Sequence, residues 1–159
     1  MKAENVKIGG IIQKRNLAKI SVLAIPDRPG VAGVVFSALG ARGINCPFIV
    51  HTIDLDNLDS IVLAVSRQQL DEALEVLETV KTTVGARNVV YEEAVGMIAI
   101  FGPHFGDRPG ISGIMFSALA SAEINILAIS TSISSLSCLI VASRMDDAIE
   151  ALKQAFAQP

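Results

Sequence analysis

The sequence has few of the residues that mark nucleic-acid-binding proteins. Its 159 residues include no tryptophan, and aromatic residues make up only 4% of the chain. An RNA-recognition sheet stacks bases on exposed aromatic side chains, and the stretches 60–65 and 136–141, which we expect to be central strands, contain none. The net charge is −3, and the basic patch of a nucleic-acid binder is missing. We therefore expect no nucleic-acid partner.

Cysteines and long apolar runs are also scarce. Cys46 and Cys138 are far apart and form no CxxC pair, so we expect buried thiols in a reducing compartment and neither a disulfide framework nor a metal site. No apolar run reaches the roughly 18 residues that a membrane span needs, and residues 1–10 lack the apolar segment of a signal peptide. These absences predict a cytoplasmic chain with no membrane contact and no cofactor.

The sequence does contain an internal repeat. The stretch "PDRPGVAGVVFSALGARGIN" begins at Pro26, and "GDRPGISGIMFSALASAEIN" begins at Gly106. This spacing is too long for a solenoid repeat and matches the length of a small domain. We infer that one domain has been duplicated.

Each copy has the pattern of a ferredoxin-like domain. In the first copy β-branched and apolar runs predict strands, and apolar residues at helical spacing predict helices. The expected elements are a strand (18–25), a helix from Gly30 to Gly43, two strands (44–53 and 60–65), a helix (68–80) and a strand (88–93). This β-α-β-β-α-β order places two helices on one face of an antiparallel sheet, which is an α+β fold.

The second copy ends before its fourth strand. The N-terminal stretch "VKIGGII" (6–12) belongs to no element of the first copy, and an unpaired sheet edge is a liability. We expect residues 1–13 to complete the second sheet. The predicted domains are therefore 14–94 and 95–159 with 1–13, the first inserted into the second.

The Asp-Arg-Pro-Gly corner has the features of an anion site. Proline suits the first helical turn, Gly30 permits close approach of another group, and the next helix amides lack intrahelical partners. Asp27 beside them can accept hydrogen bonds from an ammonium group, so the corner suits a zwitterionic amino acid. Ordinary turn chemistry, with Asp27 as a helix cap, is the alternative.

"IPDRPGVAGVVFSALGARGIN" and "INILAISTSISSLSCLI" resemble the paired ACT domains of aspartokinase, and the resemblance runs from about Val6 to Phe156. It implies a non-catalytic regulatory module, either a regulatory subunit or a C-terminal regulatory region, that mediates feedback inhibition by lysine, threonine or both. Nothing in the chain resembles the kinase domain, so a catalytic kinase subunit is a possible partner. A homodimer is also expected.

The resemblance implies an effector site where the turn of the first domain meets the Ile-Asn strand of the second. The implied effector-binding residues are Asp27, Arg28, Pro29, Gly30, Val31, Ala32, Asn45, Pro47, His51, Asn125 and Ile126. A pseudo-equivalent second site comprises Asp107, Gly110, Ile111 and Ser112.

Two of these positions depart from the family pattern. Pro47 stands where the family has an acidic residue, and its side chain cannot bind an ammonium group. His51 replaces the ligand-binding glutamine, and a neutral histidine offers one donor and one acceptor on separate ring nitrogens. An ACT-type interaction module without an effector, or a regulator of a different enzyme of amino-acid metabolism, therefore stays open.

We expect no catalytic residues. Ser130, Thr131 and Ser132 lack a histidine and carboxylate to activate them. The acidic stretch "DLDNLD" (54–59) lacks the pattern of a calcium loop, and we interpret it as a solvated hairpin turn. An enzyme or RNA binder on the same scaffold is disfavoured on these grounds, although the fold alone does not exclude either.

Overall fold

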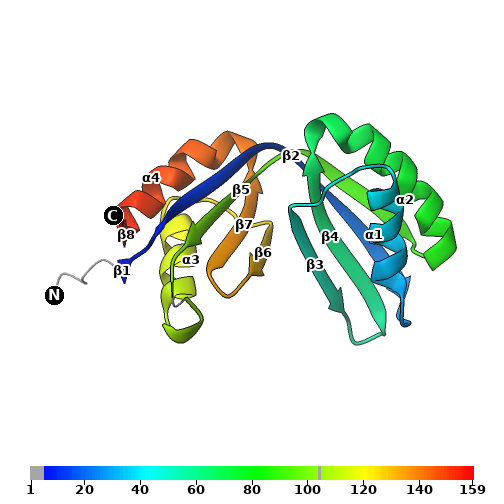
Figure 1. Cartoon of the computed structure of the whole chain (residues 1–159), viewed down its shortest axis with the longest axis horizontal. Coiled ribbons are helices and arrows are strands. Elements are labelled where there is room, and N and C mark those ends of the chain that lie inside the picture. Colours follow the sequence, from blue (N-terminus) through cyan, green and yellow to red (C-terminus); the bar gives the residue numbers. More distant parts are fainter. Residues whose placement is uncertain (1–5, 104) are drawn as a thin grey trace. The chain divides into compact units, whose positions relative to one another are not determined.

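The computed structural model describes residues 6–103 and 105–159, and the chain divides into two compact units. Residues 16–94 form one unit, called here the inserted unit. The residues up to Arg15 and residues 95–159 form the other, called here the outer unit. The expected α+β fold, with one ferredoxin-like domain inserted into another, is confirmed (Figure 1).

The inserted unit has a four-stranded sheet in the order β3-β4-β2-β5, with two helices on one face (Figure 1). Strand β4 pairs antiparallel with both β2 and β3. Its elements are the second part of β2 (Gly10–Pro26), α1 (Val31–Ala41), β3 (Phe48–Ile53), β4 (Leu58–Ser66), a 3₁₀ turn (Arg67–Gln69), α2 (Leu70–Val84) and the first part of β5 (Asn88–Phe101).

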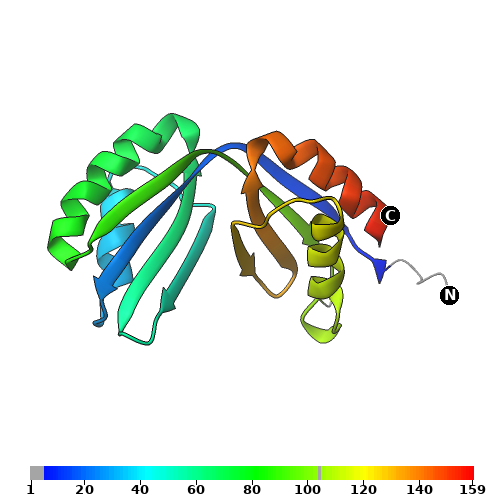
Figure 2. The ribbon, with the colours of Figure 1, turned by 180° about the vertical axis from the view of Figure 1, so that it is seen from behind.

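The outer unit repeats this arrangement with the strand order β2-β5-β7-β6, as Figure 2 shows from behind. Its remaining elements are β1 (Val6–Lys7), a 3₁₀ turn (Phe105–Asp107), α3 (Ile111–Ser121), β6 (Ala128–Thr131), β7 (Ser135–Val141), a 3₁₀ turn (Ala142–Arg144), α4 (Met145–Ala155) and β8 (Phe156–Ala157).

The N-terminal segment is tied firmly into the outer unit. Strand β1 pairs parallel with β8, Ile8 is buried, and its amide donates to the carbonyl of Ala157 at 2.9 Å. The amide of Gly9 donates to the carbonyl of Phe101 at 2.7 Å, and a Cβ on Gly9 would lie 2.9 Å from the Phe101 ring. Glycine therefore permits the close packing of this segment. Residues 1–5, also part of the predicted 1–13 segment, lie outside the described residues.

Several predicted boundaries were wrong. The stretches 88–93 and 96–101 form one continuous strand, β5, and β2 likewise joins residues 10–12 to 18–25. Residues 13–16, between 10–12 and 18–25, are polar and lack a strand-like apolar pattern, yet their backbone is extended. Strand β3 begins at Phe48 and not at Ile44, because Pro47 has no backbone donor for a sheet.

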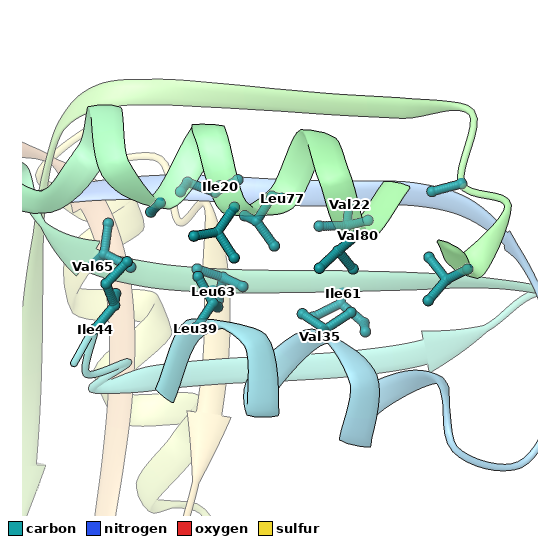
Figure 3. Close-up of a cluster of buried hydrophobic side chains, with 14 of the residues drawn as sticks. Ile20, Val22, Val35, Leu39, Ile44, Ile61, Leu63, Val65, Leu77 and Val80 are labelled. Carbon is teal, nitrogen blue, oxygen red and sulfur yellow. The ribbon is translucent and has the colours of Figure 1, made fainter. Parts of the chain in front are cut away.

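Each unit has its own hydrophobic core. Helix α1 buries Val31, Val35 and Leu39, at i, i+4 and i+8, whereas Val34 is 40% exposed. Figure 3 shows the core of the inserted unit, with Val35 and Leu39 of α1 facing Ile61 and Leu63 of β4. In the outer unit α3 buries Ile111, Met115 and Leu119 at the same spacing.

Across residues 6–103 and 105–159, none of the helices is both long enough and apolar enough to span a membrane.

Candidate functional site

The corner before α1 leaves the first helix amides without a capping side chain. Gly30 is the N-cap, with φ 98° in the left-handed region that favours glycine, and no side chain caps the helix. The amide of Val34 donates to the carbonyl of Gly30 at 3.0 Å. The amides of the preceding three residues have no intrahelical acceptor. Asp27 does not cap the helix, which removes the reason for treating it as ordinary turn chemistry.

The charged residues of this corner have different surroundings. Asp27 is exposed, and its backbone amide donates to the carbonyl of Asn57 at 3.0 Å. The guanidinium of Arg28 donates to the carbonyl of Thr83, near the end of α2, at 3.1 Å. Arg28 is therefore bonded to α2, and Asp27 is the exposed acidic residue of the corner.

His51 lies at the same end of the sheet as this corner and contacts a buried carboxylate. Its Nε2 is 2.9 Å from Oδ2 of Asp59, whose side chain is 1% exposed, against 35% for His51. Asp59 lies opposite Ile25, at the end of β2, just before the corner. The structure thus brings together His51 and Asp59, at the end of the sheet where β2 leads into the corner that contains Asp27.

The sequence analysis missed Asp59 because it interpreted 54–59 as a solvated turn. That interpretation holds for Asp54, whose Oδ1 accepts the amides of Asp56 and Leu58, but it was wrong for Asp59. The available signal was the alternation along β4, where Asp59 precedes the buried Ile61 and Leu63 at intervals of two.

Asn45 and Pro47 do not join the corner within the inserted unit. Both lie between the end of α1 and the start of β3. Helix α1 has 11 residues, which corresponds to about 16 Å along its axis. Because the corner is at the beginning of α1, these two residues lie at the opposite end of the unit. Val31 and Ala32 contribute backbone amides, while their side chains pack on the core.

The second corner shares the backbone of the first but forms a cavity. Gly110 caps α3 with φ 93°, again without a side-chain cap, and Asp107 is in the 3₁₀ turn before it. A cavity of about 190 Å³ lies here. Its lining residues are Phe105, Arg108, Ile111, Ser112, Thr131, Ser132, Ser135 and Leu136. The lining contains one cationic side chain and four hydroxyls.

Asn125 and Ile126 lie in the loop that follows α3, where Asn125 is exposed and Ile126 packs on the core of the outer unit. Arg144 holds this loop, since it donates to the carbonyls of Ala122 at 2.8 Å and Glu123 at 3.1 Å. The loop therefore has a fixed backbone within its own unit.

The thiols are poorly suited to act as nucleophiles or ligands. Burial raises the pKa of Cys46 and raises the pKa of Cys138 to about 12, so both are protonated near neutral pH. Among the described residues, no three His, Cys, Asp or Glu side chains are grouped to hold a metal ion. The inserted corner is instead suited to bind a small zwitterion, because helix amides attract a carboxylate and the nearby acceptors attract an ammonium.

Comparison with known proteins gives one consistent result. A family model described as an ACT domain matches residues 98–156. The aspartokinase of Mycolicibacterium smegmatis is 32% identical over 155 residues, which cover 96% of this chain and 37% of that protein. The chain thus spans little more than a third of the length of such curated relatives.

Two solved structures match over nearly their whole length. The ligand-free regulatory subunit of aspartate kinase from Thermus thermophilus has a TM-score of 0.86 and 31% identity, over 94% of this chain and 99% of that one. A structure of aspartokinase alpha and beta subunits has a TM-score of 0.85 and 28% identity, over 93% and 97%.

Proposed function

The chain belongs to the family of ACT-domain regulatory subunits of aspartate kinase, and we propose that it binds a free amino acid and thereby regulates an aspartokinase catalytic subunit or domain. The chain itself carries out no catalysis in this proposal. Its two ACT domains are residues 14–94 and residues 95–159 with 1–13. The effector is lysine, threonine or both, and binding mediates feedback inhibition.

The observation that carries this proposal is the uncapped start of α1 beside two acceptors. The amides of Val31 and Ala32 bind the effector carboxylate, and the space beside Gly30 is open, since a Cβ there would meet no atom within 4 Å. Asp27 and His51 accept hydrogen bonds from the effector ammonium. Arg28 and Pro29 keep the backbone of the corner in place, since Arg28 is bonded to α2.

The remaining residues implied by the resemblance are part of the same proposal. Asn125 and Ile126 contact the effector from a loop that follows α3. Asn45 and Pro47 are in the corresponding loop after α1. We therefore assign them to effector contacts made by that loop and not to the corner of the inserted unit. The second corner, with Asp107, Gly110, Ile111 and Ser112, is a pseudo-equivalent site.

Titration calorimetry of the chain with lysine, threonine and alanine tests effector binding. We expect heat from lysine or threonine, none from alanine, and at least a tenfold loss of affinity in Asp27→Asn, because one charge-assisted hydrogen bond contributes about 1.5–3 kcal/mol. Asp56→Asn is the matched control, since Asp56 is an exposed acid outside the corner. If every amino acid of the aspartate family gives no heat, the effector role is wrong.

The proposed partners are a catalytic kinase subunit and a second copy of this chain. The solved alpha and beta subunit structure supports the first. Exposed apolar residues on the sheet edges support the second, since Ile49 on β3 and Ile129 on β6 are 42% and 40% exposed. Co-purification with a tagged aspartokinase catalytic subunit and sedimentation of the isolated chain test the two partners separately.

An interaction module without an effector is the second candidate, and Pro47 favours it. The family's acidic residue is replaced there by a side chain that cannot bind an ammonium group. Sedimentation that is unchanged by any amino acid, together with activation of a partner kinase, supports this candidate. Regulation of a different enzyme of amino-acid metabolism is tested by the same co-purification.

A further inference from the structure

The inserted unit contains a buried carboxylate, Asp59, among apolar core residues. Asp59 is fully buried, and its Oδ1 has no hydrogen-bond partner among the described residues. Leaving a buried polar atom unsatisfied is unfavourable, and such an atom calls for an explanation. The other oxygen, Oδ2, makes one contact, with Nε2 of His51 at 2.9 Å. Its position next to the proposed effector site points to a role through His51.

The position of Asp59 follows from strand register. It lies opposite Ile25 on β2 and Ile53 on β3. It is two residues before Ile61 on β4 and therefore on the same face of the sheet as Ile61, which faces α1 in Figure 3. Asp59 therefore lies on the helix-covered face of the sheet. Its end of the sheet is where β2 runs into the corner that precedes α1.

The contact between Asp59 and His51 determines which nitrogen of the imidazole carries hydrogen. With the carboxylate of Asp59 as the acceptor, Nε2 of His51 is the donor. In a neutral imidazole Nδ1 is then an acceptor. No hydrogen-bond partner for Nδ1 is found in the described part of the chain, and the His51 side chain is 35% exposed. His51 thus has a free acceptor at the surface.

We infer that Asp59 is a positioning residue that fixes His51 as an acceptor for the ammonium group of the effector. The inference rests on the proposed function, and it explains how a histidine serves at a position where related chains have a glutamine. The ligand class is an α-amino acid with a free ammonium. A carboxylic acid without the ammonium binds the α1 amides but gains nothing from His51.

Among the described residues, the outer unit has no equivalent pair. Thr131 lies opposite Leu136 as His51 lies opposite Ile61. Ser134 precedes Leu136 by two residues, as Asp59 precedes Ile61, and it is exposed. Hydroxyl groups at both positions rotate freely and fix no acceptor. The inference therefore applies to the inserted corner alone.

Nitrogen-15 NMR of the effector-free chain, at about pH 8 where an ordinary imidazole is neutral, tests the tautomer. We expect hydrogen on Nε2 of His51, and His51→Gln identifies the signal. Replacing Asp59 by leucine removes the acceptor, so the His51 signals should move toward a mixture of tautomers. Hydrogen on Nδ1 in the wild-type chain overturns the inference, whether or not an amino acid binds.

Calorimetry then tests the effect on binding, with threonine, lysine and 3-hydroxybutyrate (threonine without its ammonium) as probes. We expect Asp59→Leu and His51→Leu each to weaken binding of the amino acid at least tenfold. The double variant should lose no more than either single one, since the two residues act as a unit. His51→Gln should stay within about threefold of wild type, because the amide oxygen replaces Nδ1 as acceptor. Binding of 3-hydroxybutyrate should not change.

Asp56→Asn is the matched control, because Asp56 is an exposed acid of the same turn. Asp59→Ala, which also removes the acceptor, replaces Asp59→Leu if the leucine variant fails to fold. Amino-acid binding that is equal in wild type and the Asp59 variants overturns this inference alone. Absence of amino-acid binding to the wild-type chain overturns the proposed function together with this inference.

Discussion

The two corners have the same backbone and different chemistry. Each begins an 11-residue helix with a left-handed glycine, at φ 98° for Gly30 and φ 93° for Gly110, and neither helix has a side-chain cap. At the adjoining strand ends, the inserted unit carries the histidine and buried acid, Asp59. The outer unit instead has a cavity lined by Arg108 and hydroxyls.

This difference shows which parts of a duplicated domain are constrained. The helix start is fixed by packing, because Val31 and Ile111 each anchor the first turn in their core. The strand ends and the arginines of the turn carry no such constraint. Arg28 is bonded to the carbonyl of Thr83, whereas Arg108 lines the cavity. The inserted unit therefore has His51 and Asp59 at its strand ends, and the outer unit has a cation in its cavity.

The largest expected effects come from matched core residues in the two helices. Leu39 of α1 and Leu119 of α3 are both buried, at 1% and 0% exposed. Truncation of either to alanine should lower the free energy of unfolding by about 2–5 kcal/mol, from lost burial and the cavity that remains. Urea denaturation measures this loss.

Hydrogen exchange locates the loss within the chain. Because each leucine belongs to a separate core, Leu39→Ala should speed exchange mainly in residues 16–94 and Leu119→Ala mainly in residues 95–159. Val34→Ala, on the exposed side of α1, serves as the control with little change. Equal acceleration in both units by one variant contradicts two independent cores.

An intermediate effect is expected at the glycine caps. Alanine at Gly30 or Gly110 must adopt a left-handed backbone, which costs about 1–2 kcal/mol, so the two variants should lose similar stability. Their binding should differ, because only the methyl group at Gly30 projects where the effector carboxylate is proposed to bind. Thermal unfolding and calorimetry with threonine measure the two effects, and equal binding losses contradict the assignment of the main effector site to the inserted corner.

Much of this comparison could be predicted from the sequence. The repeat predicted both corners and the helix that follows each of them. The Pro-Gly pair and the apolar spacing from Val31 to Leu39 are local signals of a turn and a helix, so they can be recognised in the sequence alone. Local signals also predicted that residues 6–12 fill a gap in the second sheet. The length of β2 could not be predicted, because Gln13 to Asn16 are polar and extended only through strand pairing.

The His51–Asp59 pair was harder to predict because it depends on register. The two residues are eight apart in the chain, and only the antiparallel pairing of β3 with β4 places their side chains within hydrogen-bond distance. The bulge between Val22 and Ile25, where Ala24 has φ 55°, also gave no clear sequence signal. Alanine seldom adopts that conformation, and it occurs here directly before the corner.

The smallest expected effect distinguishes the two units by their cysteines. Burial raises the pKa of Cys138 in the outer unit from the ordinary 9.0 to about 12, and it also raises the pKa of the less buried Cys46 in the inserted unit. A raised folded-state pKa stabilises the fold fully below pH 9.0, and this contribution declines as the pH rises through 9.0 toward 12.

At about pH 10 the wild-type chain should have lost about 1 kcal/mol of unfolding free energy relative to Cys138→Ala. Cys46→Ala should remove less of the pH slope, and a slope that both variants leave unchanged contradicts burial of the Cys138 thiol. Urea denaturation at pH 8, 9 and 10 measures how the unfolding free energy of each variant depends on pH. The difference between the two variants then compares the burial of the Cys138 and Cys46 thiols in the two units.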